Sequence, residues 1–193
     1  MAELERKIAI IGASGMLGHA LSGVFQHAIL LDFKPSDSSI RYVDITQLDK
    51  LEEAFADFGS NDWVINAAAY TKVDLAETEA GGLQSFRVNV NGPENLAKVS
   101  RSTGSKIIHF STAYVFDGKA GLYIESDERY PLNTYGKHKL VGENPVLDVG
   151  GVVLRTDTLY GPHGENFVDD IVIANARRRL AKGIKTIEIV RIK

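Results

Sequence analysis

The sequence of 193 residues contains no cysteine. Disulfide bridges, a thiolate nucleophile and cysteine metal ligands are therefore excluded. Its histidines do not recur at a spacing typical of metal sites, so we expect packed or solvated histidines and no metal. They are His19, His27, His109, His138 and His163.

Long apolar runs and an excess of basic charge are also lacking. No segment approaches the roughly 18 consecutive apolar residues of a membrane span, and the start, MAELERK, does not resemble a secretion signal. We therefore expect a cytoplasmic protein with no membrane partner. The 25 acidic and 22 basic residues give a net charge of -3, and the only dense basic run, 177–179, lies in an expected helix. No nucleic-acid partner is predicted.

What the sequence does contain is an alternation of β-branched runs with longer amphipathic segments. The strand candidates lack clean alternation, as expected for strands covered by helices on both faces. We predict an α/β fold, a doubly wound parallel sheet of Rossmann-like type, in one domain over residues 1–193. The expected strands are residues 7–11, 28–32, 41–45, 62–69, 105–111, 150–155 and 186–192, and the expected helices are residues 14–26, 48–58, 82–103, 134–144 and 166–182.

A glycine-rich turn, GASGMLG, directly follows the first expected strand. A strand, such a turn and a helix in succession aim unpaired helix amides at a pyrophosphate, while glycines let phosphate oxygens approach the backbone. Tight turns also use glycine for conformational reasons alone, so the context has to decide. We predict that the domain binds NAD(P) through Gly12, Ser14, Gly15, Met16, Leu17 and Gly18.

Two carboxylates follow at strand ends. Asp32 lies 20 residues after Gly12, where an acid can bind both ribose hydroxyls of an adenosine, although it could instead cap the strand end. An acid there favours NADH, but Lys34 is close enough to accept a 2′-phosphate, so NADPH stays open. Asp44 could take the adenine amino group or form a turn, and we include Ile45 beside it in the predicted cofactor site.

The stretch TYGKHK places Tyr135 and Lys139 one helical turn apart on one face. Bringing a tyrosine pKa from about 10 to neutrality requires roughly 4 kcal/mol of phenolate stabilisation. A cation about 4 Å away supplies about that much at an effective dielectric near 20. The pair can therefore move a proton, although the same spacing also occurs on ordinary solvated helix faces.

Four segments in order carry a resemblance to a known family. NAAAYTKVDLAE (66–77), HFSTAYVFDG (109–118), PLNTYGKHKLVGE (131–143) and LRTDTLYGPHGENFV (154–168) resemble the dTDP-4-dehydrorhamnose reductase family of the extended short-chain dehydrogenase/reductase superfamily. The resemblance implies hydride transfer from NADH or NADPH to the C4 ketone of a nucleotide-linked 6-deoxyhexose, in dTDP-rhamnose biosynthesis. The implied partner is thus a nucleotide-sugar substrate.

The resemblance also implies site residues. Tyr135 would protonate the ketone oxygen, Lys139 would lower the tyrosine pKa and bind the nicotinamide ribose, and the Thr112 hydroxyl would polarise the carbonyl. The segment Ala67, Ala68 and Ala69, with Asn66 before it, would line the cofactor. The implied substrate residues are Thr112, Tyr135, Asn166 and Phe167, and Asn89 resembles a position packed near the active site.

Two departures from the family keep alternatives open. Family members usually carry aspartate where this chain has Ala113, and they continue past the equivalent of Lys193. We therefore expect the smaller substrate-binding part to be largely absent, with its start in residues 155–193, and apolar surface left there could promote a homodimer. The alternatives are a non-catalytic nucleotide-binding regulatory subunit, or another sugar-nucleotide epimerase or dehydratase.

Overall fold

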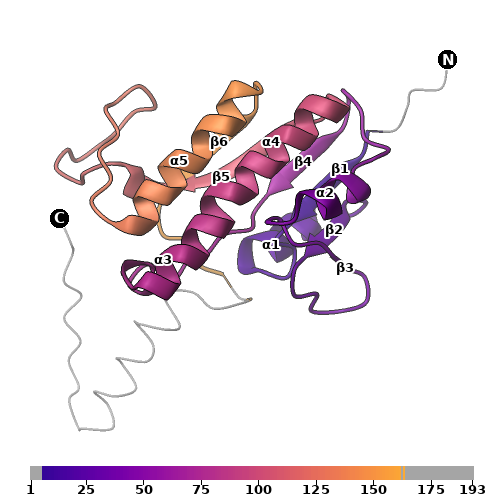
Figure 1. Cartoon of the computed structure of the whole chain (residues 1–193), viewed down its shortest axis with the longest axis horizontal. Helices are drawn as coiled ribbons and strands as arrows, with labels where there is room; N and C mark the ends of the chain where they lie inside the picture. Colours follow the sequence, from indigo (N-terminus) through magenta and orange to yellow (C-terminus); the bar gives the residue numbers. More distant parts are fainter. Residues whose placement is uncertain (1–5, 162, 164–193) are drawn as a thin grey trace, which may run out of the picture.

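The computed structural model describes residues 6–161 and 163, which form a parallel sheet with helices on both faces (Figure 1). Within these residues the chain alternates strands and helices, as the sequence predicts. The strands are β1 (Ile8–Ile11), β2 (Ile29–Asp32), β3 (Arg41–Tyr42), β4 (Trp63–Asn66), β5 (Lys106–Thr112) and β6 (Val152–Thr156). The helices are α1 (Met16–Val24), α2 (Leu48–Ala54), α3 (Glu79–Phe86), α4 (Gly92–Thr103) and α5 (Thr134–Asp148), with short turns η1 (Leu75–Glu77), η2 (Arg87–Asn91) and η3 (Ala113–Val115).

The strand order is β3-β2-β1-β4-β5-β6, and each neighbouring pair is parallel. The chain first winds outward from β1 to β3 and then resumes on the other side of β1 with β4. This arrangement is the doubly wound topology of dinucleotide-binding domains, and it confirms the predicted fold class. In such sheets ligands bind outside the carboxyl ends of the strands where the order reverses, here between β1 and β4.

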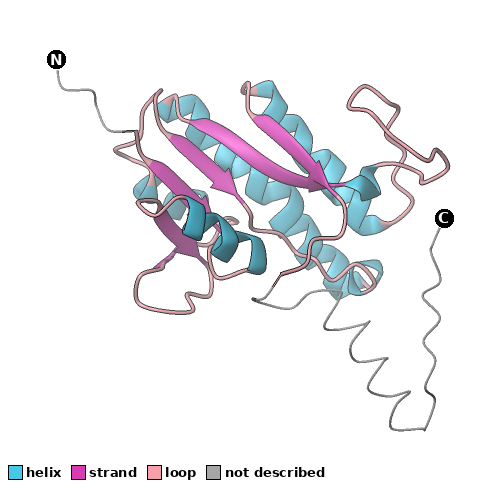
Figure 2. Cartoon of the chain, turned by 180° about the vertical axis from the view of Figure 1, so that it is seen from behind, coloured by secondary structure: helices cyan, strands magenta, loops and turns pink. Residues whose placement is uncertain are grey.

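Successive residues of each strand are buried on opposite faces of the sheet. On one face Ala9, Ile11 and Val64 join a large core with the side chains of α2, α4 and α5, such as Leu51 and Leu96. The other face is covered by α1 (Figure 2). A smaller core lies there, with Ile10, Ala13, Ile40 and Ile65 at its centre. Burial on both faces explains why the strands read as continuous apolar runs.

The segment predicted as one helix over residues 82–103 begins earlier, at Glu79, and contains a π-helical turn, η2. Proline at position 93 supplies no amide hydrogen for the carbonyl oxygen of Asn89, and the amide of Gly92 bonds instead to Arg87, five residues back. Helix α5 packs against this wide turn. A side chain at Gly142 would overlap the Asn89 carbonyl oxygen, so only glycine permits the approach.

Helix α5 begins between two hydrogen-bonding side chains. Asn133 accepts a bond from the amide of Gly136 (2.7 Å), as a helix-capping residue does. Glu77 of η1 accepts bonds from the amide (2.7 Å) and the hydroxyl (2.9 Å) of Thr134. A side chain at Gly136 would overlap the carbonyl oxygen of Tyr114, so this glycine brings the first turn of α5 against η3.

One predicted strand is shorter than expected, and two predicted elements lie outside the described residues. The expected strand 41–45 is a true strand only at Arg41–Tyr42, because Val43 and Ile45 turn into the core. The expected helix 166–182 and strand 186–192 lie outside the described residues, as do Asn166 and Phe167. Within the described part of the chain, no helix is long and apolar enough to cross a membrane, and no three potential ligands cluster to hold a metal.

Candidate active site

The glycine-rich turn lies between the carboxyl end of β1 and the start of α1. Gly12 has a φ of +85°, a left-handed conformation that favours glycine, and a Cβ there would lie 2.6 Å from the amide nitrogen of Ala68. A Cβ at Gly18 would overlap the Gly12 carbonyl oxygen. Both glycines are therefore required by the close approach of β1, α1 and the segment after β4.

Gly15 is different, because it is the residue that immediately precedes α1. It has an extended conformation, and no side chain of the described residues caps the helix behind it. The amides of the first turn, from Met16 on, therefore keep hydrogen-bonding capacity and carry the partial positive charge of a helix amino terminus. This arrangement fits a phosphate group. Ser14, Met16 and Leu17, which the sequence also predicts to bind the cofactor, belong to the same glycine-rich stretch.

Asp32 ends β2 beside this turn, and its side chain is only 7% exposed. Its two carboxylate oxygens accept bonds from the amides of Ser14 (3.0 Å) and Lys34 (2.8 Å). The Ser14 hydroxyl in turn accepts a bond from the amide of Ser36 (3.1 Å). Asp32 thus caps the end of β2. Its carboxylate also lies where the sequence predicts a partner for the adenosine ribose.

Asp44 and Ile45 are engaged with the protein itself. Asp44 accepts bonds from the amide (2.9 Å) and hydroxyl (2.8 Å) of Thr46 and from the side chain of Gln47 (3.3 Å), which is the turn-forming alternative. The Ile45 side chain is buried in the larger core, and its carbonyl accepts a bond from Asn95 (3.2 Å). Their contact with an adenine stays a prediction.

The three alanines after β4 are half-buried, and the backbone of Ala67 and Ala68 lies against Gly12 in the glycine turn. The amide of Ala67 bonds to the Ile11 carbonyl (2.9 Å), and that of Ala68 bonds to the side-chain oxygen of Asn66 (3.1 Å). Ala69 follows in the same segment. The side chain of Asn66 is 1% exposed and points into the sheet toward His109, so its place is beneath the crevice rather than on its surface.

Thr112 and Tyr135 come together at the carboxyl end of β5, where both are buried. The Thr112 hydroxyl accepts a bond from the amide of Tyr114 (3.2 Å), and the Tyr114 ring packs edge-on against Tyr135 at 6.0 Å between centroids. Burial raises the pKa of Tyr135 above its usual value, and a hydrogen bond with Thr112 opposes that rise. The tyrosine is therefore protonated at neutral pH.

Lys139 is 1% exposed and points into the sheet. Its Nζ donates to the Phe110 carbonyl oxygen (2.6 Å) and lies 3.3 Å from Nε2 of His109. Burial lowers the pKa of Lys139 to about 8, although the charge of Glu143 acts in the opposite direction. Burial is the largest influence on the pKa of Tyr135 here and β5 supplies partners for the Lys139 amine, so the acidifying effect of Lys139 on Tyr135 stays a prediction.

A buried polar group that the sequence pattern does not reveal lies one turn further along α5. Glu143 is fully buried and accepts bonds from Ser111 (2.6 Å) and from Nε (2.9 Å) and Nη2 (2.7 Å) of Arg155, with Arg129 at 3.3 Å. Although burial raises the pKa of its carboxyl, the bonds from Arg155 and Ser111 hold it below the usual value. His109 is a second buried polar group of this kind. The signal available in the sequence is that it is a lone histidine in an otherwise apolar strand.

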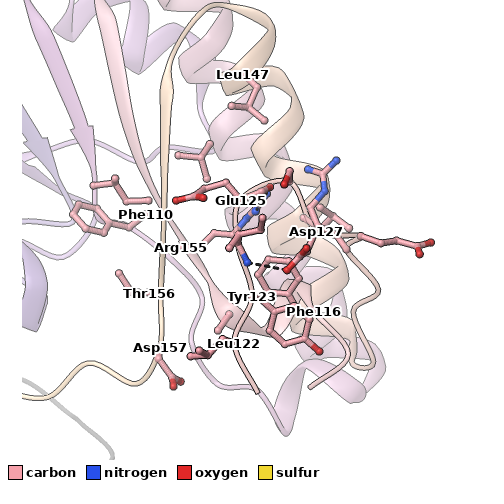
Figure 3. A pocket seen from close by; sticks show the side chains of 18 of the residues that line it. Phe110, Phe116, Leu122, Tyr123, Glu125, Asp127, Leu147, Arg155, Thr156 and Asp157 are labelled. Atoms are coloured by element: carbon pink, nitrogen blue, oxygen red, sulfur yellow. Dashed lines mark hydrogen bonds between the residues drawn. The ribbon is translucent and has the colours of Figure 1, made fainter. Parts of the chain in front are cut away.

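A large open pocket lies beside the predicted site rather than within it (Figure 3). It opens between α5, the edge strand β6 and the loop of residues 117–133, and Arg155 bonds to the Glu125 carbonyl (3.3 Å) in its wall. The predicted catalytic residues and the glycine turn do not line it. Ala113, where the resemblance predicts an aspartate, does line it and is exposed, so a carboxylate there would face this pocket.

The chain is similar in sequence to proteins of known families. Residues 6–190 match the family model described as the RmlD substrate binding domain. The chain is 37% identical over 192 residues to dTDP-4-dehydrorhamnose reductase of Aggregatibacter actinomycetemcomitans, over 95% of this chain and 60% of that relative. It is also 35% identical over 163 residues to methionine adenosyltransferase 2 subunit beta of Rattus norvegicus, over 81% of this chain and 48% of that relative.

Among solved structures, dTDP-4-dehydrorhamnose reductase from Bacillus anthracis in complex with NADP is similar, with a TM-score of 0.73 and 30% identity. The similarity covers 91% of this chain and 61% of that one. The chain therefore spans about 60% of the length of the reductases it matches. Because the family model matches nearly the whole sequence and the topology agrees, the chain belongs to the RmlD substrate binding domain family.

Proposed function

We propose that the chain forms the cofactor-binding part of an NAD(P)H-dependent reductase that converts a ketone to an alcohol. The observation that carries the proposal is the burial of Tyr135 beside Thr112 at the carboxyl end of β5. That strand neighbours β4, which flanks the reversal in strand order where such sheets bind ligands. A hydroxyl pair and a dinucleotide crevice thus lie on the same edge of the sheet.

The crevice residues fit a dinucleotide. The uncapped amino terminus of α1 presents amides to a pyrophosphate, and Asp32 lies beside them for the adenosine ribose. Ala67 to Ala69 would border the nicotinamide end, and Lys139 would hold its ribose. NADH or NADPH, when bound, would supply the hydride. Asp32 favours the first and Lys34 could accept the extra phosphate of the second, so both belong to the proposal.

The chain's own chemical task is to deliver a proton. Tyr135 carries its proton at neutral pH because burial raises its pKa, which suits a donor to a ketone oxygen that is becoming an alcohol. Thr112, which shares a hydrogen bond with that tyrosine, would hold the same oxygen and polarise the carbonyl. The exclusion of water around both hydroxyls strengthens each of these bonds.

The substrate class is proposed from the relatives. The similar proteins named dTDP-4-dehydrorhamnose reductase favour the C4 ketone of a nucleotide-linked 6-deoxyhexose, and hence a role in dTDP-rhamnose biosynthesis in the cytoplasm. The chain spans about 60% of the length of those relatives.

The test begins with titration of NADH and NADPH and continues with their oxidation by dTDP-4-dehydrorhamnose. Tyr135→Phe should retain cofactor binding and lose turnover by at least about 100-fold, since positioned proton donors contribute 10² to 10⁴. Tyr114→Phe is the matched control, because its ring packs on Tyr135 but its side chain is 50% exposed. Failure of both dinucleotides to bind, or equal turnover in Tyr135→Phe, would contradict the proposal.

A second candidate is a nucleotide-binding regulatory subunit without catalysis. It is favoured by the 35% identity to methionine adenosyltransferase 2 subunit beta, whose name describes a subunit. This candidate predicts dinucleotide binding with no oxidation by any 4-keto sugar nucleotide, and no change in that result on Ala113→Asp. Turnover by the unaltered chain that depends on Tyr135 would exclude it.

A further inference from the structure

Three polar side chains form a buried row beneath the crevice, running from β4 through β5 to α5. Asn66, His109 and Lys139 are each no more than 1% exposed. Nδ2 of Asn66 lies 2.9 Å from Nδ1 of His109, and Nε2 of the same ring lies 3.3 Å from Nζ of Lys139. Buried polar groups normally have complementary partners, so the placement of protons along this row can be worked out.

The backbone fixes the first member. The amide of Ala68 donates to Oδ1 of Asn66 (3.1 Å), and a backbone N–H cannot accept a bond from an NH₂ group. The side-chain amide therefore turns its Nδ2 toward the imidazole. Nδ1 of His109 must consequently be the acceptor of that bond, without a proton of its own.

The second member follows from its charge. Burial holds the pKa of His109 well below its usual value, so the ring is neutral and carries a single N–H. With Nδ1 unprotonated, that hydrogen sits on Nε2 and points at the lysine. An ammonium has three donors and no acceptor, whereas a neutral amine has a lone pair that can accept from Nε2 and a hydrogen for the Phe110 carbonyl.

We infer that Asn66 and His109 are positioning residues for Lys139, and that the Nε2–H tautomer they maintain makes the ammonium easier to deprotonate. The inference deepens the proposed function, because the charge on the Lys139 amine decides how that side chain can hold the nicotinamide ribose.

The other charged groups around α5 have different partners. Glu143, one turn beyond Lys139, favours the ammonium, but its carboxylate is already engaged by Arg155 and Ser111. From η1, Glu77 bonds to Thr134 at the helix start. On α5 itself His138 turns to Ser85 of α3 (3.0 Å), and Arg129 of the preceding loop reaches Glu143. Within the described residues, His109 is thus the titratable side chain of the sheet that faces the amine.

The test reads protons directly and requires neither dinucleotide nor substrate, so its failure is distinct from failure of the proposed function. In the unaltered chain, nitrogen-15 spectra of the imidazoles, with His109 assigned by its loss in His109→Phe, should show Nε2 protonated and Nδ1 unprotonated. Asn66→Asp keeps the acceptor for Ala68 and replaces only the donor that faces His109. The ring proton should move to Nδ1, and the titration midpoint of Lys139, followed by carbon-13 at Cε, should rise by about 1 to 3 units.

Asn89→Asp is the matched control, since it places a similar carboxyl beside α5 with no contact to His109. It should leave the tautomer unchanged and move the Lys139 midpoint much less than Asn66→Asp does. The inference is overturned if the unaltered chain carries the ring proton on Nδ1. It is equally overturned if Asn66→Asp leaves the Lys139 midpoint in place, or if Asn89→Asp shifts that midpoint as far.

Discussion

Burial of the Lys139 amine makes the stability of the fold depend on pH in an unusual direction. The pKa of this group is about 8 in the folded chain against 10.5 for an ordinary lysine. Below pH 8 both the folded and the unfolded chain hold the proton, and the folded chain bears the full penalty of a buried charge. Between pH 8 and 10.5 the folded chain loses its proton first, so this group makes the chain more stable as pH rises.

The difference between the two pKa values corresponds to about 3 kcal/mol. Most of it, about 2 to 3 kcal/mol, is released between pH 7 and pH 10. Lys139→Met keeps a long apolar stem and removes the titrating group. Relative to the unaltered chain, the variant should therefore be about 2 to 3 kcal/mol more favourable at pH 7 than at pH 10, whatever it loses in contact with the Phe110 carbonyl.

Urea unfolding of both chains at the two pH values measures this double difference. Lys98→Met is the matched control, because Lys98 lies on the exposed side of α4 in an ion pair with Glu94 and its loss should have nearly the same effect at both pH values. The reasoning fails if Lys139→Met changes the unfolding free energy equally at pH 7 and pH 10. It also fails if the double difference has the opposite sign.

Three further results are expected. Gly142→Ala should destabilise the chain by about 1 to 3 kcal/mol in denaturant unfolding because its Cβ would overlap a backbone carbonyl, whereas Gly23→Ala, with nothing within 4 Å, should be neutral or stabilising by up to about 1 kcal/mol; equal effects would contradict this account. Glu143→Gln should reduce the unfolding free energy by at least about 3 kcal/mol at neutral pH by leaving the Arg155 guanidinium poorly paired, and a variant as stable as the parent would show that the pair is dispensable. Glu77→Gln should lower the melting temperature and weaken the protection of the first α5 amides against hydrogen exchange, and unchanged exchange there would argue against the cap.

The fold could be predicted from sequence because its signals are local. Strands such as Ile8–Ile11 and Trp63–Asn66 are short β-branched runs, and the glycine turn occupies the place between strand and helix where the sequence puts it. The meeting of Thr112 with Tyr135 was also foreseeable, since one ends a strand and the other begins the following helix. The similarity to known reductases adds support that no single motif provides.

The partners of each side chain were less predictable, because sequence spacing gives the face of a helix and not what lies opposite. Tyr135 and Lys139 share a face, yet the carbonyl of Phe110 and the ring of His109 compete for the amine. The same holds for Asp32, whose carboxylate accepts a bond from the amide of Ser14, 18 residues away in sequence. No periodic pattern in the sequence indicates these partners of Lys139 and Asp32.

The π-helical turn between α3 and α4 limits where the chain can change its length. Asn89 within it bonds through its side chain to both backbone groups of Tyr70, while its own carbonyl oxygen lies against Gly142. Removing one residue there would rotate α3 by about 100° relative to α4, and Asn89 could no longer meet both neighbours. Insertions and deletions should therefore be tolerated in the loop of residues 117–133 and rejected in this single turn, which links the strand-end segment of the cofactor crevice to the helix that bears Tyr135.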